Sequence, residues 1–291
     1  MNARRPERPE GALVLVGTPI GNLADLSPRA VEALRDADVI AAEDTRRTRA
    51  LLSHAGVPGA RRLRSVRGPN ERRAAREVVD AVRGGARVAF VTDAGMPGVS
   101  DPGERLVRAC VDAGLTVEVV PGPSALLAAL VISGLPTQRF VFEGFLPRRG
   151  KARTERLTQL AAEPRTTVLF EAPPRVAETL ADLAAACGAA RRVAVARELT
   201  KVFEEVVRGT LADAIAHYEE HGARGEHVIV LGGVPASESA VDDETLDDAV
   251  SDALAGGLSA RDAASRVAGE LGVPKRRAYD AASRLARPAR S

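Results

Sequence analysis

The chain has 291 residues and a mass of 30.5 kDa, which predicts two domains rather than one, since a domain typically takes about 150 residues. Hydrophobic residues make up 45% of the chain but aromatic residues only 3%, so we expect a core of Ala, Val and Leu, and neither wholesale disorder nor a coiled coil. No unbroken apolar run reaches about 18 residues, and the first residues are polar, which predicts a cytoplasmic protein without a signal peptide or membrane span.

The small net charge of +2 results from cancellation between segments. Residues 46–87 carry +9 and residues 256–291 carry +5, whereas residues 236–255 carry −7. Arg supplies 38 of the 41 cations, and a compositional bias explains that ratio by itself. Such a bias does not explain the clustering. Clustered Arg is what an RNA-binding surface needs, because a guanidinium binds phosphate through two parallel hydrogen bonds.

The first part of the chain alternates short apolar runs with amphipathic segments. We expect strands over 12–16, 39–42, 87–92 and 115–120, and helices that begin at Ser27 and run over 44–52, 70–82 and 101–113. This alternation predicts a mostly parallel sheet that helices cover on both faces.

A second series follows Pro121-Gly122-Pro123. It comprises helices over 124–132, 151–162, 175–187 and 211–218, and strands over 139–143, 166–170, 192–196, 202–208 and 227–231. We therefore expect a flexible N-terminus over 1–11, an N-terminal α/β domain over 12–121 and a C-terminal α/β domain over 122–235.

The last part of the chain divides by charge. Seven carboxylates without a cation over 236–255 would repel one another in a packed core, so we expect an acidic linker with one helix there. Residues 256–291 predict two short basic helices, the first capped by Ser259 and stopped at Gly272, the second starting at Pro274. A helix-turn-helix-like nucleic-acid module and a solvated amphipathic tail are equally compatible with this pattern.

Three loops rich in small residues follow predicted strands, at Gly17–Asn22, Asp93–Gly103 and Pro121–Ala125. In a parallel sheet, ligands bind beyond the carboxyl ends of the strands, so the three loops together predict a binding site. The first loop has neither the dinucleotide spacing nor the Gly-Lys-Ser/Thr of a phosphate loop, which argues against an ATPase. Singly, each loop is equally compatible with a structural turn.

The charged clusters, the histidines and the cysteines say less about a functional site. The charged clusters at 43–47 and 197–201 are, by themselves, more typical of solvated helix caps than of catalytic sites. The four His share no metal-ligand spacing, the two Cys lie far apart in helix-like runs, and no Gly-x-Ser-x-Gly elbow occurs. We expect no metal site, no disulfide and no hydrolase triad.

Six motifs in register resemble the ribosomal RNA small subunit methyltransferase I family, within the tetrapyrrole methylase-like superfamily. They are residues 15–23, 41–46, 93–95 with 100–103, 121–125, 142–147 and 197–201. The resemblance runs from about residue 12 to residue 233, and the tail resembles a helical extension that many members carry.

The resemblance implies two α/β domains with S-adenosylmethionine in the cleft between them and a homodimeric enzyme. It also implies methylation of a cytidine 2′-oxygen in the decoding region of 16S rRNA, within the small ribosomal subunit. The implied cofactor-binding positions are Pro19, Ile20, Gly21, Asp93, Met96, Ser124, Ala125, Phe170, Gly209 and, as a weaker match, His227.

Two segments depart from the family pattern. Residues 170–175 lack the hydroxyl and the histidine that relatives usually have there, and residues 64–70 replace a stretch usually rich in His. A histidine base is therefore not expected at either place.

Methyl transfer from a sulfonium needs alignment, and a ribose hydroxyl also needs a base or a cation that stabilises the alkoxide. We expect Glu43, Asp44, Glu198 or Lys201 to supply it, because these charges follow strands that end at the predicted cleft. The predicted RNA contacts are Arg46, Arg47, Arg49, Arg61, Arg62, Arg64, Arg67, Lys275, Arg276 and Arg277. Two alternatives remain: a tetrapyrrole methylase of the same superfamily, and a non-catalytic RNA-binding protein with a vestigial cofactor cleft.

Overall fold

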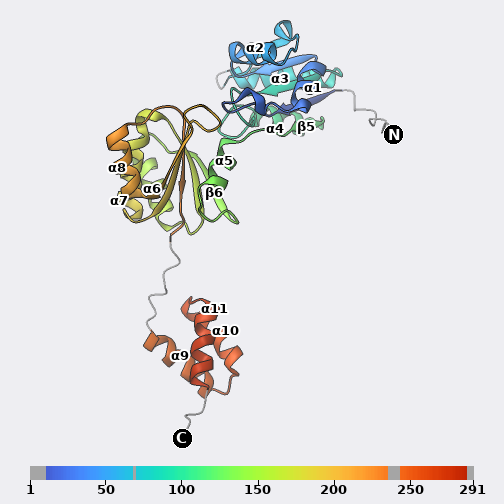
Figure 1. Cartoon of the computed structure of the whole chain (residues 1–291). Helices are drawn as coiled ribbons and strands as arrows, with labels where there is room; N and C mark the ends of the chain where they lie inside the picture. The colour runs from blue at the N-terminus through green and yellow to red at the C-terminus, as the bar shows by residue number, and fades with distance from the viewer. Residues whose placement is uncertain (1–10, 68–69, 235–242, 287–291) are drawn as a thin grey trace. The chain divides into compact units, whose positions relative to one another are not determined.

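The computed structural model describes residues 11–67, 70–234 and 243–286, and its contacts divide the chain into two compact units, residues 1–233 and 234–291 (Figure 1). Nearly all of the N-terminus that we expected to be flexible lies outside the described residues. No described helix is long and apolar enough to cross a membrane.

The first sheet of the larger unit is fully parallel, with strand order β3-β2-β4-β1-β5. Its strands are β1 (Ala12–Val16), β2 (Val39–Ala42), β3 (Leu63–Ser65), β4 (Arg87–Val91) and β5 (Val117–Val120). Its helices are α1 (Pro28–Asp36), α2 (Thr45–His54), α3 (Glu71–Arg83) and α4 (Glu104–Asp112), with 3₁₀ turns at Leu23–Asp25 and Ala60–Arg62. Apolar clusters lie on both faces of the sheet, which confirms the predicted layers for this part of the chain.

Most helix starts are capped as the sequence predicts, but two differ. Ser27 and Asp44 accept a hydrogen bond from the first turns of α1 and α2. Asn70 instead accepts from the backbone N–H of Arg67 and donates to the carbonyl of Ser65, so it holds the preceding loop. Helix α4 starts after Gly103 rather than at Asp101, which leaves the Asp101 carboxylate free of capping.

The second sheet has strand order β6-β7-β10-β8-β9, and only β6 and β7 are parallel. Its strands are β6 (Phe140–Phe145), β7 (Thr166–Glu171), β8 (Arg192–Arg197), β9 (Glu205–Thr210) and β10 (His227–Leu231). The other three pairings are antiparallel, because a tight turn folds β9 back along β8 and β10 runs between β7 and β8. The strand predicted over 202–208 starts at Glu205, since Val202 and Phe203 lie in that turn, 92% and 72% exposed.

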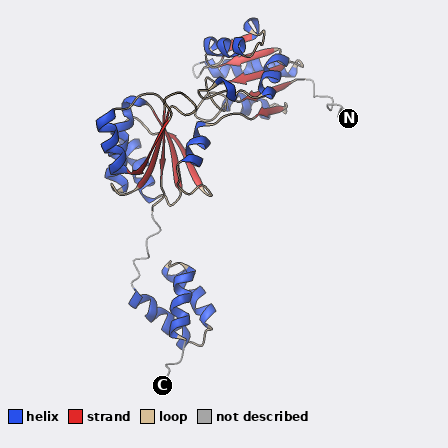
Figure 2. Ribbon diagram, viewed as in Figure 1, coloured by secondary structure: helices blue, strands red, loops and turns tan. Residues whose placement is uncertain are grey.

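Helices cover both faces of the second sheet (Figure 2). One face packs on α6 (Lys151–Ala162), α7 (Val176–Cys187) and α8 (Leu211–His221), and a 3₁₀ turn, Pro173–Arg175, leads into α7. The other face packs on α5 (Ala125–Ile132), whose N-cap is Ser124. We refer to these as the α7 face and the α5 face.

The smaller unit contains three described helices, α9 (Asp243–Ala255), α10 (Ala260–Leu271) and α11 (Lys275–Leu285). Ser259 caps α10 and Gly272 ends it in the left-handed conformation, as predicted. The acidic segment contains one helix, α9, as expected, and its Leu246, Val250 and Ala253 recur at helical spacing and pack into the core of this unit. Residues 236–242 lie outside the described part.

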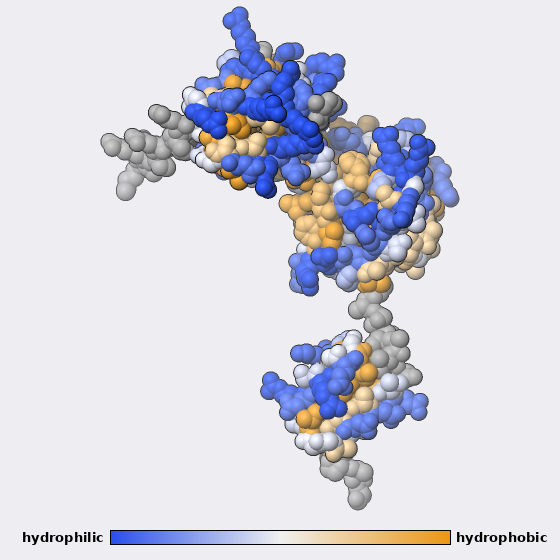
Figure 3. Space-filling model, turned by 180° about the vertical axis from the view of Figure 1, so that it is seen from behind, coloured by the Kyte–Doolittle hydropathy of each residue, from blue (hydrophilic) through white to orange (hydrophobic). Residues whose placement is uncertain are grey.

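The acidic helix α9 pairs with the basic helix α11. Arg277 donates to Asp243 and Arg284 to Asp247, at 2.7 and 2.6 Å. The carboxylates that would repel one another in a core lie instead on the outside of the unit, where cations of α11 meet them. Figure 3 shows hydrophilic residues interspersed with apolar ones on one face of this unit.

Candidate active site

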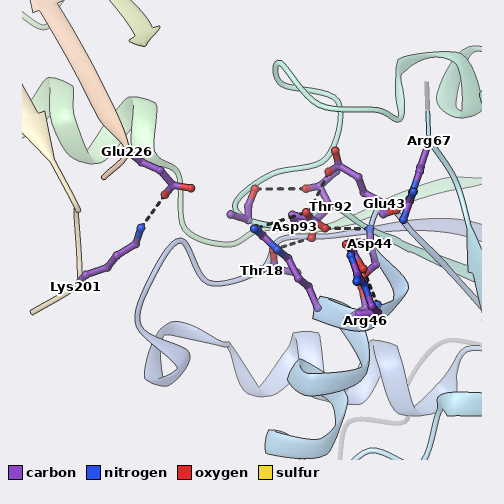
Figure 4. A network of polar contacts seen from close by, with 12 residues as sticks. Thr18, Glu43, Asp44, Arg46, Arg67, Thr92, Asp93, Lys201 and Glu226 are labelled. Carbon is purple, nitrogen blue, oxygen red and sulfur yellow. Dashed lines mark hydrogen bonds and ion pairs between the residues drawn. The ribbon is translucent and has the colours of Figure 1, made fainter. Parts of the chain in front are cut away.

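Four loops meet at the carboxyl edge of the first sheet, because β1, β2, β4 and β5 all run in the same direction. Thr18 and Gly95 exchange two backbone hydrogen bonds, of 2.9 and 3.1 Å, which join the loop after β1 to the loop after β4. The Asp93 carboxylate accepts from the backbone N–H of Asp44 at 3.0 Å, which joins the β4 loop to the start of α2 (Figure 4).

Glycines at this edge allow close backbone contacts. A Cβ at Gly17 would lie 2.6 Å from the backbone nitrogen of Gly122, so a side chain at either position would separate the loops after β1 and β5. A Cβ at Gly21 would lie 2.5 Å from Cγ of Lys201. The neighbouring N–H of Asn22 donates to the Thr200 hydroxyl at 3.1 Å, so the β1 loop also contacts the β8–β9 turn of the second sheet.

A cavity of about 340 Å³ lies beside these loops and is lined from both sheets. Its lining residues are Ile20, Ala94, Gly95, Met96, Val99, Ser100, Asp101, Ser124, Ala125, Leu126, Phe145, Phe170, Glu171, Ala172, Pro173, Glu226, His227 and Val228. The wall is mainly apolar and includes carboxylates but no Lys or Arg. It therefore suits an amphipathic ligand with a positive charge better than an anionic one.

The structure brings six of the ten predicted cofactor residues to this cavity: Ile20, Met96, Ser124, Ala125, Phe170 and His227. Pro19 and Gly21 lie in the β1 loop but not on the cavity wall. Asp93 is engaged with Asp44 and Arg47. Gly209 lies within β9, where a Cβ would lie 2.6 Å from the Asp213 carboxylate that caps α8, so its role in this structure is local packing.

The His227 ring lies on the α7 face of the second sheet, the face of Ile229, while Val228 packs on the α5 face. It packs edge-on against Tyr218, with ring centroids 5.5 Å apart. Nδ1 lies 2.9 Å from the Gly225 carbonyl, and burial lowers the pKa of His227, which favours the neutral ring with its proton on Nδ1.

None of the four predicted catalytic residues lines the cavity. Asp44 caps α2, and the Arg46 backbone N–H and guanidinium that bind it lower the pKa of its carboxyl. Burial raises the pKa of Glu43, whose Oε2 accepts from the backbone N–H of Asp93 at 3.3 Å. Figure 4 shows Glu43, Thr92 and Asp93 close together at this edge.

Glu198 and Lys201 form an ion-pair cluster with Glu226. The Lys201 ammonium donates to both carboxylates, at 2.9 Å each, and Figure 4 shows its contact with Glu226. Glu198 also accepts from the backbone N–H of Glu226. Hydrogen bonds from Lys201 and Glu226 lower the pKa of Glu198. Glu226 lines the cavity, so Lys201 is one residue removed from it.

Sequence reasoning missed three carboxylates of the cavity wall, Asp101, Glu171 and Glu226. Asp101 was missed because Asp-Pro before a Glu is typical of a helix start. It lines the cavity instead. Burial, then the charges of Glu43 and Asp93, raise the pKa of Asp101 to about 6, against a hydrogen bond with Thr92 that lowers it. A carboxylate within a glycine-rich loop after a buried strand was the available sequence signal.

Eight of the ten predicted RNA contacts are exposed: Arg46, Arg47, Arg49, Arg61, Arg64, Arg67, Lys275 and Arg276. Arg62 is half-buried and donates to the carbonyls of Leu34, Arg35, Ala37 and Pro58, so it fastens the end of α1 to the segment before β3. Arg277 is half-buried beside Asp243.

The comparisons with known proteins agree with this architecture. The family model for Tetrapyrrole (Corrin/Porphyrin) Methylases matches residues 12–215. A protein of Mycobacterium tuberculosis named ribosomal RNA small subunit methyltransferase I is 47% identical over 273 residues, which cover 93% of this chain and 94% of that protein. A protein of Synechocystis sp. with the same name is 44% identical over 270 residues, 92% of this chain and 96% of that protein. The chain belongs to the ribosomal RNA small subunit methyltransferase I family.

Members of the family differ in length. A Thermotoga maritima member, 46% identical over 223 residues, matches 99% of its own length but 77% of this chain, so it is too short to hold both units. Among solved structures, uroporphyrin-III-C-methyltransferase from Thermus thermophilus matches with a TM-score of 0.55 and 23% identity, over 77% of this chain and 95% of that one. A diphthine synthase matches with a TM-score of 0.59 and 17% identity, over 76% and 90%. These two likenesses confirm the predicted fold class.

Proposed function

We propose that this protein is a methyltransferase of small-subunit ribosomal RNA that uses S-adenosylmethionine to methylate the ribose 2′-oxygen of a cytidine in the decoding region. Membership of the family supports the reaction class and the RNA substrate. The observation that carries the proposal is the cavity, whose wall is apolar and bears negative but no positive side chains.

The residues of the cavity fit the proposed cofactor. Phe170, Met96 and Leu126 offer apolar and polarisable surface for a nucleoside base and a thioether-like chain, and Asp101 offers negative charge for a sulfonium. When bound, S-adenosylmethionine supplies an electrophilic methyl group. A cavity of about 340 Å³ lies within the range of roughly 300–1,000 Å³ that small-molecule sites occupy.

Asp101 is the residue that we assign as proton acceptor, because it alone combines a place on the cavity wall with a carboxylate that no cation or backbone N–H in the described chain neutralises. The acceptor hydroxyl would lose its proton to Asp101 as its oxygen bonds to the methyl carbon, while the bond from that carbon to sulfur breaks and the sulfur leaves as a neutral thioether. Burial, and then charge repulsion from Glu43 and Asp93, raises the pKa of Asp101 and so makes its carboxylate more basic. Asp44 and Glu198 have structural partners, which makes them weaker candidates.

RNA binding is assigned to the exposed cations of residues 46–67 and of α11. Their side chains reach solvent, and each phosphate contact would make binding more dependent on salt. We further propose a homodimer acting in the cytoplasm on the small ribosomal subunit.

The test is transfer of labelled methyl from S-adenosylmethionine to small ribosomal subunits and to deproteinised RNA, followed by mapping of the product. We expect a 2′-O-methylcytidine in the decoding region. Methyl transfer to a base, or to a tetrapyrrole and no RNA, would overturn the proposal, and cofactor binding without transfer to any RNA would favour a non-catalytic protein.

The catalytic assignment has its own test. Asp101→Asn should lower kcat by roughly 10²- to 10⁴-fold, the usual contribution of a general base. The kcat of the unchanged protein should fall below a pH of about 6, and this limb should be absent in Asp101→Asn. Glu43→Gln, Asp44→Asn, Glu198→Gln and Lys201→Met are compared in parallel; loss of turnover in one of them but not in Asp101→Asn would refute the assignment.

A further inference from the structure

A β-bulge in β6 places two phenylalanines on the same face of the second sheet. The pairing of β6 with β7 shifts by one residue between Phe142 and Gly144. In a regular strand Phe142 and Phe145 would point to opposite faces, but the extra residue, Glu143, restores them to one face. Both rings accordingly flank Phe170, at centroid distances of 5.1 and 5.8 Å.

Glu143 itself is turned toward α6, where Arg156 donates to both of its oxygens. Phe142 and Phe170 are half-buried, but Phe145 is 52% exposed and lines the cavity. The bulge therefore presents one aromatic ring at the cavity mouth with its inner side against Phe170 and its outer side in solvent.

A buried polar network holds the segment that follows Phe145. Arg153 is 6% exposed and donates to the Pro147 carbonyl at 3.0 Å, to Thr179 and to Asp182. The Arg175 guanidinium donates to the Leu146 carbonyl at 3.0 Å.

The network closes through a buried carboxylate. Glu171 accepts from the Thr179 hydroxyl at 2.7 Å and pairs with Arg175 at 3.2 Å. Charge-assisted bonds to backbone carbonyls in a buried setting fix the path of this segment. The ring and the residues after it are thus presented by a rigid support.

Two cations follow on this segment without a partner. Arg148 and Arg149 are exposed, and within the described part of the chain neither has a hydrogen bond or an ion pair. Lys151, by contrast, pairs with Glu155. Neither Arg belongs to the RNA-binding residues assigned above.

The bulge also contacts the loop of the proposed proton acceptor. A Cβ at Gly144 would lie 3.1 Å from the Ser100 hydroxyl, and Ser100 precedes Asp101. Phe145 follows Gly144 and Asp101 follows Ser100, so the exposed ring and the carboxylate belong to the residues next to this contact. A nucleotide on the ring would be next to the group that we expect to take the proton.

We propose that Phe145, Arg148 and Arg149, the Phe145 platform, bind a nucleotide of the substrate RNA, with a base stacked on the ring and flanking phosphates on the two guanidinium groups. An exposed aromatic ring beside unpaired Arg is the combination by which proteins bind unpaired RNA. The platform rests on the proposed function, because RNA is the substrate assigned there, and it adds the element that delivers the target nucleotide to the cavity.

The test measures RNA binding as a function of salt and methyl transfer with both substrates varied. The probe is deproteinised small-subunit ribosomal RNA. Arg148→Ala/Arg149→Ala should reduce the slope of log affinity against log salt by about 1.4, since each phosphate contact with a single strand contributes about 0.7. The KM for S-adenosylmethionine should not change. Arg148→Lys/Arg149→Lys should keep the slope, and Arg35→Ala/Arg108→Ala, which removes two exposed Arg elsewhere, is the matched control.

Phe145→Ala should weaken RNA binding by roughly 5- to 150-fold, the range for loss of one base–aromatic stack, and Phe145→Trp should restore it. Unfolding temperature, measured for every variant, separates loss of the platform from loss of the fold. If Phe145→Ala raises only the KM for S-adenosylmethionine, the ring belongs to the cofactor site and the platform is wrong.

The two proposals fail in different ways. The platform alone would be overturned if the protein without substitutions methylates RNA and Arg148→Ala/Arg149→Ala has the same salt slope and the same KM for RNA. The proposed methyl transfer alone would be overturned if the protein without substitutions methylates no RNA but the Phe145→Ala and Arg148→Ala/Arg149→Ala variants lose RNA binding as predicted.

Discussion

Asp101→Asn should make the protein more stable at neutral pH while it removes the proposed proton acceptor. Folding raises the pKa of Asp101 from 3.8 to about 6, so the folded state holds the ionised carboxylate at a cost. At 1.36 kcal/mol per pKa unit the full shift corresponds to about 3 kcal/mol, and because the group is half-exposed we expect about 1–2 kcal/mol. That gain should raise the unfolding temperature by about 2–8 °C, at roughly 2–4 °C per kcal/mol for a unit of this size.

The pH dependence gives the sharper check. The folded state binds the proton more tightly, so the cost is absent below the unfolded pKa of 3.8, grows as pH rises, and is complete above about 6. The advantage of Asp101→Asn over the unchanged protein should therefore be larger at pH 8 than at pH 5. Thermal unfolding at both pH values measures it, with Asp112→Asn on the exposed end of α4 as control. An advantage that is equal at the two pH values, or a loss of stability at pH 8, would refute the reasoning.

Three further predictions concern the cations and the smaller unit. Arg62→Ala should lower the free energy of unfolding by about 1.5–3 kcal/mol, since charged hydrogen bonds to α1 are lost, whereas Arg64→Ala should weaken RNA binding and leave stability unchanged; chemical denaturation and RNA titration separate the two. Asp243→Asn/Asp247→Asn should strengthen RNA binding by about 1.4- to 5-fold in low salt, because α11 loses two surface ion pairs; equal affinity would contradict this. Removal of residues 234–291 should leave kcat unchanged and raise the KM for RNA, as the short Thermotoga maritima relative suggests; a fall in kcat would contradict it.

The sequence predicted those parts of the fold that local patterns specify. Strands β2 and β10 have the expected bounds because each is a buried apolar run between polar turns. The β6 bulge was not predictable, because it is defined by hydrogen bonds to β7, which lies beyond α6 in the chain. The antiparallel order of the second sheet was missed for the same reason: Val202 and Phe203 resemble strand residues, and only pairing along β8 shows that they form a turn.

The candidate site was predictable as a place but not as a set of chemical groups. Loops after parallel strands had to meet at one edge, so Ile20 and Ser124 were expected near one another. Which side chains line the cavity depends on finer geometry. The sequence around Asp44 is compatible with a catalytic acid, but Asp44 caps a helix. The sequence around Asp101 is typical of a helix cap, but Asp101 lines the cavity.

Because the acidic helix α9 packs beside the basic helix α11, the smaller unit has an electric dipole moment. Residues 236–255 and 256–291 carry −7 and +5, so the unit as a whole is negative even though one of its helices is basic. A polyanion at long range does not attract such a body but rotates it until the basic helix faces the polyanion. The unit is thereby suited to setting the angle at which RNA is met rather than the rate at which it is found.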